Sequence, residues 1–409
     1  MDRTLFCLLF VTTFICAWVN SAQAGDKMLA TGVEDIRVLL FDEYDIDEFL
    51  IFAMNGSVFM SNEDGNVITV QEGETGARLA SVRRGIRYNR DGRSTTSGEW
   101  TISGTGTSLI RFFSPETGWR YYYGVIRVSK DENDNLRFIN QVNLEDYVAS
   151  VVGSEMHFDH PEALKVQAVI SRTYALWNIS LFQERDYELT DNIMNQVYLG
   201  EHISKPRYRE AAEATRDQVL MWSDKLIMAV YHSTCGGRTA SNTSVWSGNA
   251  LPYLVGIHDN QSCSASPHYR WDSEVGVANI HRIFKRDRRN PVVRIDVANR
   301  DSFERVTHVM IYYRNGVEKL PLNTFRLAVN RRLGNMTIRS AYFDMKVNAD
   351  SYIFSGRGMG HGVGLCQWGA LGLAESGWRY SDILKFYYKG VDITHYNQLH
   401  GDGYKLARF

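Results

Sequence analysis

The 409-residue sequence has almost no excess of charge of either sign. Its 45 Lys and Arg residues nearly balance its 47 Asp and Glu residues, and the formal net charge is -2. A chain without a strong field does not attract polyanions, so we expect no nucleic-acid partner. Since 44% of the residues are hydrophobic, the length and composition predict two or three folded units with sizeable cores.

Long apolar runs are also scarce, and the one at residues 5–19 is shorter than the roughly 20 residues that a membrane-spanning helix needs. Arg3 precedes it, and Ala22-Gln23-Ala24 resembles a cleavage site. This pattern predicts a signal peptide at residues 1–24. We therefore expect an exported protein, periplasmic, extracellular or cell-wall associated, without a transmembrane segment after cleavage.

Cysteine is rare: the five present include no CxxC pair, and three lie beyond the predicted signal peptide, at Cys235, Cys263 and Cys366. An odd number of thiols cannot be fully paired within one chain. His232 precedes Cys235 with H-x2-C spacing, so His232, Cys235 and Cys263 are candidate zinc ligands. A Cys235–Cys263 disulfide, which suits an exported protein, and unlinked buried thiols are the alternatives.

The patterning predicts an α+β fold with a β-rich N-terminal portion and a mixed α/β catalytic core that forms a groove. Alternating apolar residues and Asn-Gly or Asp-Gly turns indicate the strands. Residues 94–106, rich in Ser, Thr and Gly, predict a loop or an edge hairpin. The expected organisation is a β-rich region at 25–140, a catalytic region at 141–395 with a β-rich insertion at about 275–350, and a tail at 396–409.

Helical spacing and capping residues predict four helices, at 161–182, 204–216, 367–375 and 381–388. By contrast, the β-branched run Tyr147–Val152 predicts a strand that breaks at Gly153-Ser154.

Glu155 is a candidate catalytic acid, because we expect it in a loop directly before the 161–182 helix. Lys165 and Arg172 are seven residues apart on that helix, so they should project from one side of it. The competing interpretation is that all three are solvated surface groups.

The glycine-rich segment Gly356–Gly364 could be mistaken for a phosphate-binding loop. It lacks the G-K-[ST] ending of such loops, so nucleotide binding is not expected. His361 within it is a candidate substrate donor, and the alternative is a histidine packed in the core.

Five segments in this order resemble the SpoIID/LytB family of bacterial cell-wall proteins. They are LEDYVASVVGSEM at 144–156, PEALKVQAVISRTYAL at 161–176, QVYLG at 196–200, YHSTCGGRT at 231–239 and GRGMGHGVGLCQWGA at 356–370. Two departures from the family pattern are His157, where proline is usual, and the cysteines at 235 and 366, where many members have serine.

The resemblance implies a peptidoglycan lytic transglycosylase that cleaves the MurNAc–GlcNAc bond and leaves 1,6-anhydroMurNAc ends. It implies that Glu155 is the single catalytic acid/base and that the substrate-binding residues along a glycan groove are Lys165, Arg172, Tyr198, His361 and Gln367. Peptidoglycan glycan strands are then the partner, and catalysis needs no cofactor. Some relatives bind zinc near the segment that matches His232–Cys235, which implies a structural zinc.

Two other functions remain open at this stage. A non-enzymatic amidase enhancer, or cell-wall binding partner, would act with a cell-wall amidase. A zinc-dependent cell-wall hydrolase would hold a catalytic metal at His232, Cys235 and Cys263. For the transglycosylase, Lys165 and Arg172 are expected to contact anionic substrate groups, because direct pairing with Glu155 would oppose its protonation.

Overall fold

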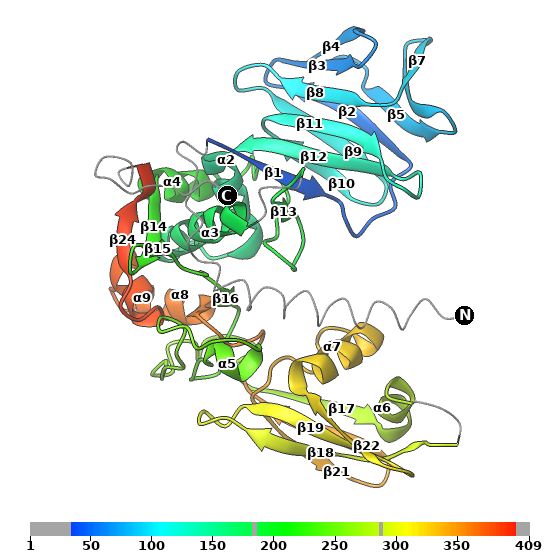
Figure 1. Ribbon diagram of the computed structural model, residues 1–409. Coiled ribbons are helices and arrows are strands. Elements are labelled where there is room, and N and C mark those ends of the chain that lie inside the picture. Colours follow the sequence, from blue (N-terminus) through cyan, green and yellow to red (C-terminus); the bar gives the residue numbers. More distant parts are fainter. Residues whose placement is uncertain (1–33, 182–185, 286–288, 398–409) are drawn as a thin grey trace. The chain divides into compact units, whose positions relative to one another are not determined.

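The computed structural model describes residues 34–181, 186–285 and 289–397 (Figure 1). These residues form two compact units. The N-terminal unit contains residues 34–220, 226–228 and 393–397, and the C-terminal unit contains 221–225 and 229–392. Both units combine helices with sheets, so the predicted α+β class is confirmed. The predicted signal peptide and most of the predicted tail lie outside the described residues.

The N-terminal unit contains two large, mainly antiparallel sheets. The strands of the seven-stranded sheet are, in spatial order, β13 (Leu189–Thr190), β1 (Asp35–Leu40), β12 (Leu136–Asn143), β11 (Val125–Lys130), β8 (Trp100–Gly104), β3 (Ser57–Asn62) and β4 (Val67–Gln71). Those of the six-stranded sheet are β10 (Gly118–Tyr122), β9 (Leu109–Ser114), β2 (Glu48–Met54), β5 (Ala77–Val82), β6 (Gly85–Arg90) and β7 (Arg93–Ser97).

Aromatic side chains join the inner faces of these two sheets. Phe138 of β12 lies with its ring centroid 5.0 Å from that of Phe49 on β2 and 5.6 Å from that of Phe112 on β9. Alternate residues of β2 are buried, as expected for a strand with one face on a core. The two sheets therefore form a β-sandwich.

The expectation of a loop or edge hairpin at residues 94–106 is right for β7 and wrong for β8. β7 is the edge strand of its sheet, whereas β8 lies between β11 and β3. Trp100 and Ile102 of β8 are fully buried, and the indole of Trp100 donates to Ile86 O at 3.1 Å. The Ser and Thr residues that suggested a loop occupy the other face of the strand.

Three helices of the N-terminal unit pack on one another: α2 (Leu144–Glu155), α3 (Pro161–Leu181) and α4 (Arg207–Ala214) (Figure 1). The predicted helices at 161–182 and 204–216 are confirmed by α3 and α4. The predicted strand at 147–152 is wrong, because this run belongs to α2. Its valines fall at helical as well as strand spacing, and burial in the core overrides their β propensity.

Gly153 continues α2 instead of breaking it. A Cβ atom at this position would lie 2.3 Å from His202 Cδ2 and 2.5 Å from Tyr208 Cδ2. The glycine is therefore required by the close approach of the α4 region to the helix, and not by a turn.

The C-terminal unit contains a parallel pair and two three-stranded antiparallel sheets. The parallel pair is β16 (Tyr231–His232) with β23 (Leu365–Cys366). The sheets are β17 (Trp271–Gly276), β22 (Ser351–Gly356) and β21 (Phe343–Val347), and β18 (Val292–Arg300), β19 (Val306–Tyr313) and β20 (Val317–Pro321). The remaining strands are β14 (Gln218–Trp222), β15 (Lys225–Leu226) and β24 (Asp392–His395), and each of them contains a boundary between the two units.

The helices of the C-terminal unit are α5 (Asn242–Val245), α6 (Val277–Ile283), α7 (Leu322–Leu333), α8 (Gln367–Glu375) and α9 (Tyr380–Tyr387). α8 and α9 confirm the two predicted helices near the end of the chain. α6 and α7 share one hydrophobic core with strands β17 to β22, and Ile295, Phe325 and Phe354 lie at its centre.

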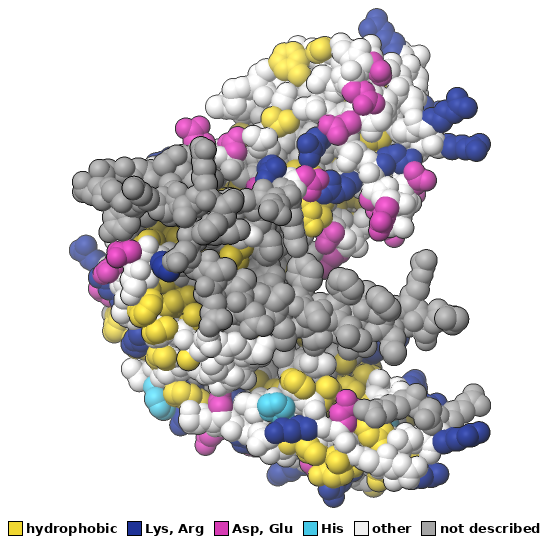
Figure 2. Space-filling view, viewed as in Figure 1, with side chains coloured by type: hydrophobic (Ala, Val, Ile, Leu, Met, Phe, Trp, Pro, Cys, Tyr) yellow, Lys and Arg dark blue, Asp and Glu magenta, His cyan; other side chains and the backbone are white. Residues whose placement is uncertain are grey.

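Charged side chains of both signs are interspersed over the β-sandwich on the face drawn in Figure 2. This distribution agrees with the nearly neutral net charge. Among the helices of the described residues, none combines the length and apolar character needed to span a membrane.

Candidate functional site

Glu155 is the last residue of α2 and is partly exposed. Its neighbours in the chain, Ser154 and Met156, are both buried, so the carboxylate is the group that the helix end presents outward. The backbone N–H of Val197 donates to Glu155 Oε1 at 2.7 Å. Glu155 therefore lies at a helix end and not in a loop, and a residue distant in sequence orients its carboxylate.

The segment 196–200, one of the five family-like segments, is fixed against α2 by hydrogen bonds. They join Tyr147 Oη to Gln196 Oε1 (3.1 Å), Ser150 Oγ to Gly200 O (2.6 Å) and Leu199 N to Ser154 Oγ (3.3 Å). Tyr121 of β10 bridges to Gly200 from the other side, and its carbonyl accepts from Glu201 N at 2.7 Å. The segment thus connects the sandwich to α2 and places the Val197 N–H beside the carboxylate.

Ser154 and His202 lie directly beside this arrangement and were not predicted from the sequence. Ser154 Oγ lies 3.1 Å from His202 Nε2 and also donates to Ser150 O. Burial lowers the pKa of His202. The only sequence signal for Ser154 was its position directly before the glutamate.

Tyr198 is 2% exposed, which contradicts its predicted contact with substrate. Its hydroxyl donates to Asn140 Oδ1 at 2.7 Å, and its ring lies 5.1 Å from that of Tyr147. Burial raises the pKa of Tyr198 well above its usual value. Its role is to anchor the 196–200 segment in the core.

Arg172 is completely buried, so the predicted contact with anionic substrate groups is wrong. Its Nε and Nη2 atoms donate to the two carboxylate oxygens of Glu145 at 2.7 and 2.5 Å. Its remaining bonds go to the carbonyls of Gln218 and Ala212, each at 3.1 Å. Spacing on α3 could not reveal this, because other segments of the chain pack over the helix at Arg172 but leave Lys165, two turns earlier, partly exposed.

Lys165 lies on a partly exposed face of α3, where its side chain is 27% exposed. Its Nζ atom is 2.7 Å from Glu162 Oε1, one helical turn away. Lys165 and Arg172 therefore lie in different environments, although they are two turns apart on one helix.

His361 belongs to the C-terminal unit, and both of its ring nitrogens face backbone groups. Nε2 lies 2.7 Å from Tyr231 O, and Nδ1 accepts from Val363 N at 3.1 Å. Removal from solvent lowers the pKa of His361 to about 4, so the neutral ring is favoured. His361 is half-buried, and both ring nitrogens are engaged by the backbone of its own unit.

Gln367 is the first residue of α8 and is only 8% exposed, so its side chain lies within the C-terminal unit. The predicted site residues thus divide between the units. Glu155, Lys165, Arg172 and Tyr198 belong to the N-terminal unit, and the remaining predicted residues belong to the C-terminal unit.

The predicted metal ligands overlap in part with a cluster of donor groups in the C-terminal unit. One donor atom each from Cys235, Asp259, Cys263 and Cys366 lies within 4.8 Å of the others, and all four residues are buried. The predicted ligand His232 is not a member. Its Nδ1 lies 3.1 Å from Val363 O, and its buried Nε2 has no hydrogen-bond partner in the structure. Asp259 and Cys366 were not predicted as ligands.

The three cysteines are free in this structure. The Sγ atoms of Cys235 and Cys263 are 3.4 Å apart, whereas a disulfide bond measures about 2.05 Å. Burial raises the pKa of the Cys235 and Cys366 thiols, and hydrogen bonds with them lower the pKa of Cys263. Burial also raises the pKa of Asp259, to about 7.

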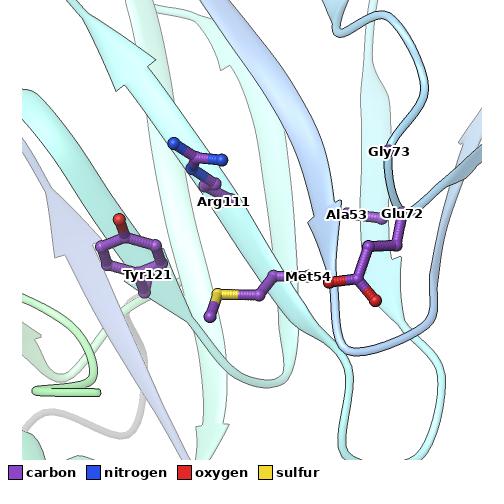
Figure 3. Close-up of a pocket in the computed structure, with 6 residues that line it drawn as sticks. All are labelled: Ala53, Met54, Glu72, Gly73, Arg111 and Tyr121. Atoms are coloured by element: carbon purple, nitrogen blue, oxygen red, sulfur yellow. The ribbon is translucent and has the colours of Figure 1, made fainter. Parts of the chain in front are cut away.

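A separate cavity of about 460 Å³ lies in the N-terminal unit (Figure 3). It is lined by Ala53, Met54, Glu72, Gly73, Arg111 and Tyr121. None of the predicted catalytic, substrate-binding or metal-binding residues lines it.

Two models of protein families match parts of the chain. The model described as stage II sporulation protein matches residues 132–222, which contain Glu155, α2, α3 and the 196–200 segment. A model for a domain of unknown function matches residues 259–364, which contain strands β17 to β22.

Individual proteins are similar to a longer part of the chain than the family models are. The chain is 32% identical to an uncharacterised protein of Brachyspira hyodysenteriae over 288 residues, which are 68% of this chain and 73% of that protein. It is 30% identical to stage II sporulation protein D of Bacillus amyloliquefaciens, with 63% of this chain and 75% of that protein aligned. It is 26% identical to the amidase enhancer of Bacillus subtilis, over 58% of this chain and 38% of the enhancer. The chain belongs to the SpoIID/LytB family, as the five segments indicated.

Proposed function

We propose that this protein is an exported lytic transglycosylase that acts on peptidoglycan, with Glu155 as its single acid/base. The observation that carries the proposal is the placement of Glu155 at the exposed end of a buried helix, with one carboxylate oxygen held by Val197 N at 2.7 Å. Catalytic groups need such fixed orientation, which a solvated surface glutamate lacks.

The reaction needs only one carboxyl group, because the nucleophile comes from the substrate. Glu155 first protonates the glycosidic oxygen between MurNAc and GlcNAc, and the bond from this oxygen to C1 of MurNAc breaks. The carboxylate then takes the proton of the MurNAc 6-hydroxyl as that oxygen bonds to C1. The product is a 1,6-anhydroMurNAc end, and the proton is back on Glu155. Ordinary glycosidases use a second carboxyl group for the nucleophilic step.

The Val197 N–H favours one of the two oxygens of Glu155 as the site of the proton. The carbonyl oxygen of a carboxylic acid accepts hydrogen bonds more strongly than its hydroxyl oxygen does, so the Val197 N–H favours Oε1 as the unprotonated oxygen of the resting acid. The transferable proton then resides on Oε2. This division keeps the same oxygen available for both the acid step and the base step.

Lys165 is the remaining cation proposed to contact the substrate. Its side chain is partly exposed, and its partner Glu162 is on the same face of α3. A lactyl or peptide carboxylate of the glycan strand would compete with Glu162 for Lys165. Arg172 has no part in this role, because it is buried.

The test compares Glu155→Gln with the matched control Glu162→Gln in a peptidoglycan digest analysed by mass spectrometry. Both changes remove one partly exposed carboxylate near α3, but only the first removes the proposed acid. We expect Glu155→Gln to release no 1,6-anhydromuropeptides and Glu162→Gln to release them. Circular dichroism would verify that both variants are folded. Undiminished release by folded Glu155→Gln would refute the proposal.

A second candidate is a non-enzymatic role as an activator of a cell-wall amidase. The observation that favours it is the 26% identity to a protein named amidase enhancer. Purified wild-type protein would be added to an amidase digesting cell walls. Faster amide cleavage that Glu155→Gln supports equally well, without any anhydro-sugar, would favour this role.

The third alternative, a zinc hydrolase, receives no support from the buried cluster. A catalytic zinc keeps a coordination position open to water and substrate. All four donor residues of the cluster are buried, so water and substrate have no access. His232, one of its predicted ligands, is not a member.

A further inference from the structure

We propose that Cys235, Asp259, Cys263 and Cys366 form a closed structural site for one thiophilic divalent cation, with zinc as the best match. This inference concerns the stability of the C-terminal unit and does not depend on the proposed catalytic function. The set differs from the H-x2-C set predicted from the sequence by the absence of His232 and the presence of Asp259 and Cys366.

Three segments far apart in the chain meet at the cluster. Parallel pairing of β16 with β23 sets His232 opposite Cys366, which brings the segment after β16 beside the start of α8. The backbone N–H of Cys235 then reaches Cys366 Sγ at 3.2 Å, across 131 residues of sequence. Asp259 and Cys263 come from a third segment, which is joined to Gly237 O through Asp259 N at 3.0 Å.

The spacing of the donors fits a small tetrahedral ion. Zn–S bonds of about 2.3 Å place two thiolate sulfurs about 3.8 Å apart, and Zn–O bonds are slightly shorter. The observed donors all lie within 4.8 Å of one another, and Cys235 Sγ and Cys263 Sγ are 3.4 Å apart. Three sulfur donors select a soft or borderline ion, so Mg²⁺ and Ca²⁺ are poor matches.

Groups around the cluster are placed as outer-shell partners of a metal site. Cys366 Sγ accepts from two backbone amides, Cys235 N at 3.2 Å and Gly369 N at 3.3 Å. The buried Tyr387 hydroxyl donates to Asp259 Oδ1, and Cys263 N donates to Oδ2 at 3.1 Å. Such bonds orient ligands and stabilise the deprotonated forms that bind the cation.

Gly369 lies in close contact with two of these surrounding groups. A Cβ atom here would lie 2.0 Å from the Tyr387 hydroxyl and 2.6 Å from Asp259 Oδ1. Cys366 is the N-cap residue of α8, and glycine at 369 lets the first turn of this helix lie against Tyr387 and Asp259.

A buried cation beside the cluster indicates that the site is built for excess negative charge. Arg305 is 1% exposed and donates to Cys235 O at 2.7 Å, while its Nε and Nη1 atoms have no hydrogen-bond partner in the structure. Three thiolates and a carboxylate carry more negative charge than a divalent ion neutralises. Burying an unpaired guanidinium costs desolvation free energy, and the excess negative charge of the cluster offsets this cost.

A Cys235–Cys263 disulfide accounts for fewer of these features. It would consume two donors, leave Cys366 as a lone thiol and give the completely buried Asp259 no cation to face. It also gives no reason for the distant Cys235 N–H to point at the sulfur of Cys366. A bound cation satisfies all four donors together.

The test measures metal content and thiols on the full-length protein. Protein purified without added metal should contain one equivalent of zinc, as measured by elemental mass spectrometry. Cobalt(II) exchanged for zinc should give the intense visible bands of a tetrahedral thiolate site. The protein would be denatured in the presence of a chelator, and its thiols would be counted with a thiol reagent. The count should be the same before and after treatment with a reductant. Two thiols appearing only after reduction, or a metal-free protein without cobalt bands, would overturn the proposal.

Two variants keep the test independent of misfolding. Asp259→Asn retains all thiols and the shape of the side chain, and we expect it to lose at least tenfold in zinc affinity, measured by competition with a chromophoric chelator. The matched control is His258→Ala, because His258 is the exposed neighbour of Asp259 and should bind zinc as the wild type does. Chelation should also lower the melting temperature of the wild type. Equal zinc affinity in all three proteins would refute the assignment of Asp259 as a ligand.

Discussion

The backbone N–H of Val197 donates to the Glu155 carboxylate at 2.7 Å across 42 residues of sequence. This bond joins the end of α2 to the 196–200 segment, which is itself held by Tyr147, Ser150 and Ser154. The position of the proposed acid therefore depends on the backbone N–H of Val197, a residue whose side chain has no functional group.

Replacing Val197 by proline should slow the reaction, because proline has no N–H to donate. A hydrogen bond to a charged group contributes about 1.5–3 kcal/mol, which corresponds to a loss of about ten- to a hundredfold in rate if it acts in the transition state. Release of 1,6-anhydromuropeptides would be measured for Val197→Pro beside Val197→Ala, which keeps the N–H. Equal rates for the two folded variants would show that the bond does not orient the acid.

Gly153→Ala should destabilise the protein although alanine favours helices. The gain in helix propensity is at most about 1 kcal/mol. The new Cβ would lie 2.3 Å from His202 Cδ2 and 2.5 Å from Tyr208 Cδ2, and overpacking of this kind typically costs about 1–3 kcal/mol. The melting temperature should therefore fall. Adding His202→Ala should partly restore it by removing one of the two clashes. A higher melting temperature in Gly153→Ala would contradict the close packing.

Arg172→Ala should lower the free energy of unfolding of the N-terminal unit, because the Glu145 carboxylate stays buried without its partner. Breaking a buried ion pair in this way costs about 3–5 kcal/mol. Lys165→Ala on the same helix should change stability by no more than about 0.5 kcal/mol, as most partly exposed sites do. Calorimetric melting of both variants would measure the difference. A stable Arg172→Ala variant with weakened binding of glycan would instead restore the role predicted from the sequence.

Stability of the C-terminal unit should fall on acidification because of His361. Its pKa is lowered from 6.5 to about 4 in the folded protein, so the unfolded chain binds the proton first as pH decreases. The stabilisation is fully present above about pH 6.5 and is lost between about 6.5 and 4. Melting temperatures across this range would be compared with those of His361→Gln, which cannot titrate. An unchanged difference between the two proteins from pH 7 to pH 4 would refute this effect.

The elements that sequence patterns predicted correctly are those whose local signals agree with their packing. Pro161 at the start of α3 and the helix at 367–375 are examples, since caps and apolar spacing act within a few residues. α2 was missed because a β-branched run with a glycine satisfies strand patterns locally. Its helical state depends on burial of its valines and on the approach of His202 to Gly153.

The sequence by itself determined the family, the α+β class and the identity of the proposed acid, because five ordered segments carry that information in their residue types. Only the tertiary structure decided what the neighbouring residues do. It buried Arg172 against Glu145 and joined the Tyr198 hydroxyl to Asn140 in the core. It also gathered Asp259 and Cys366, but not His232, around Cys235 and Cys263. The physical reason is that burial and distance are set by contacts between segments far apart in the chain. Spacing along one helix or loop does not encode those contacts.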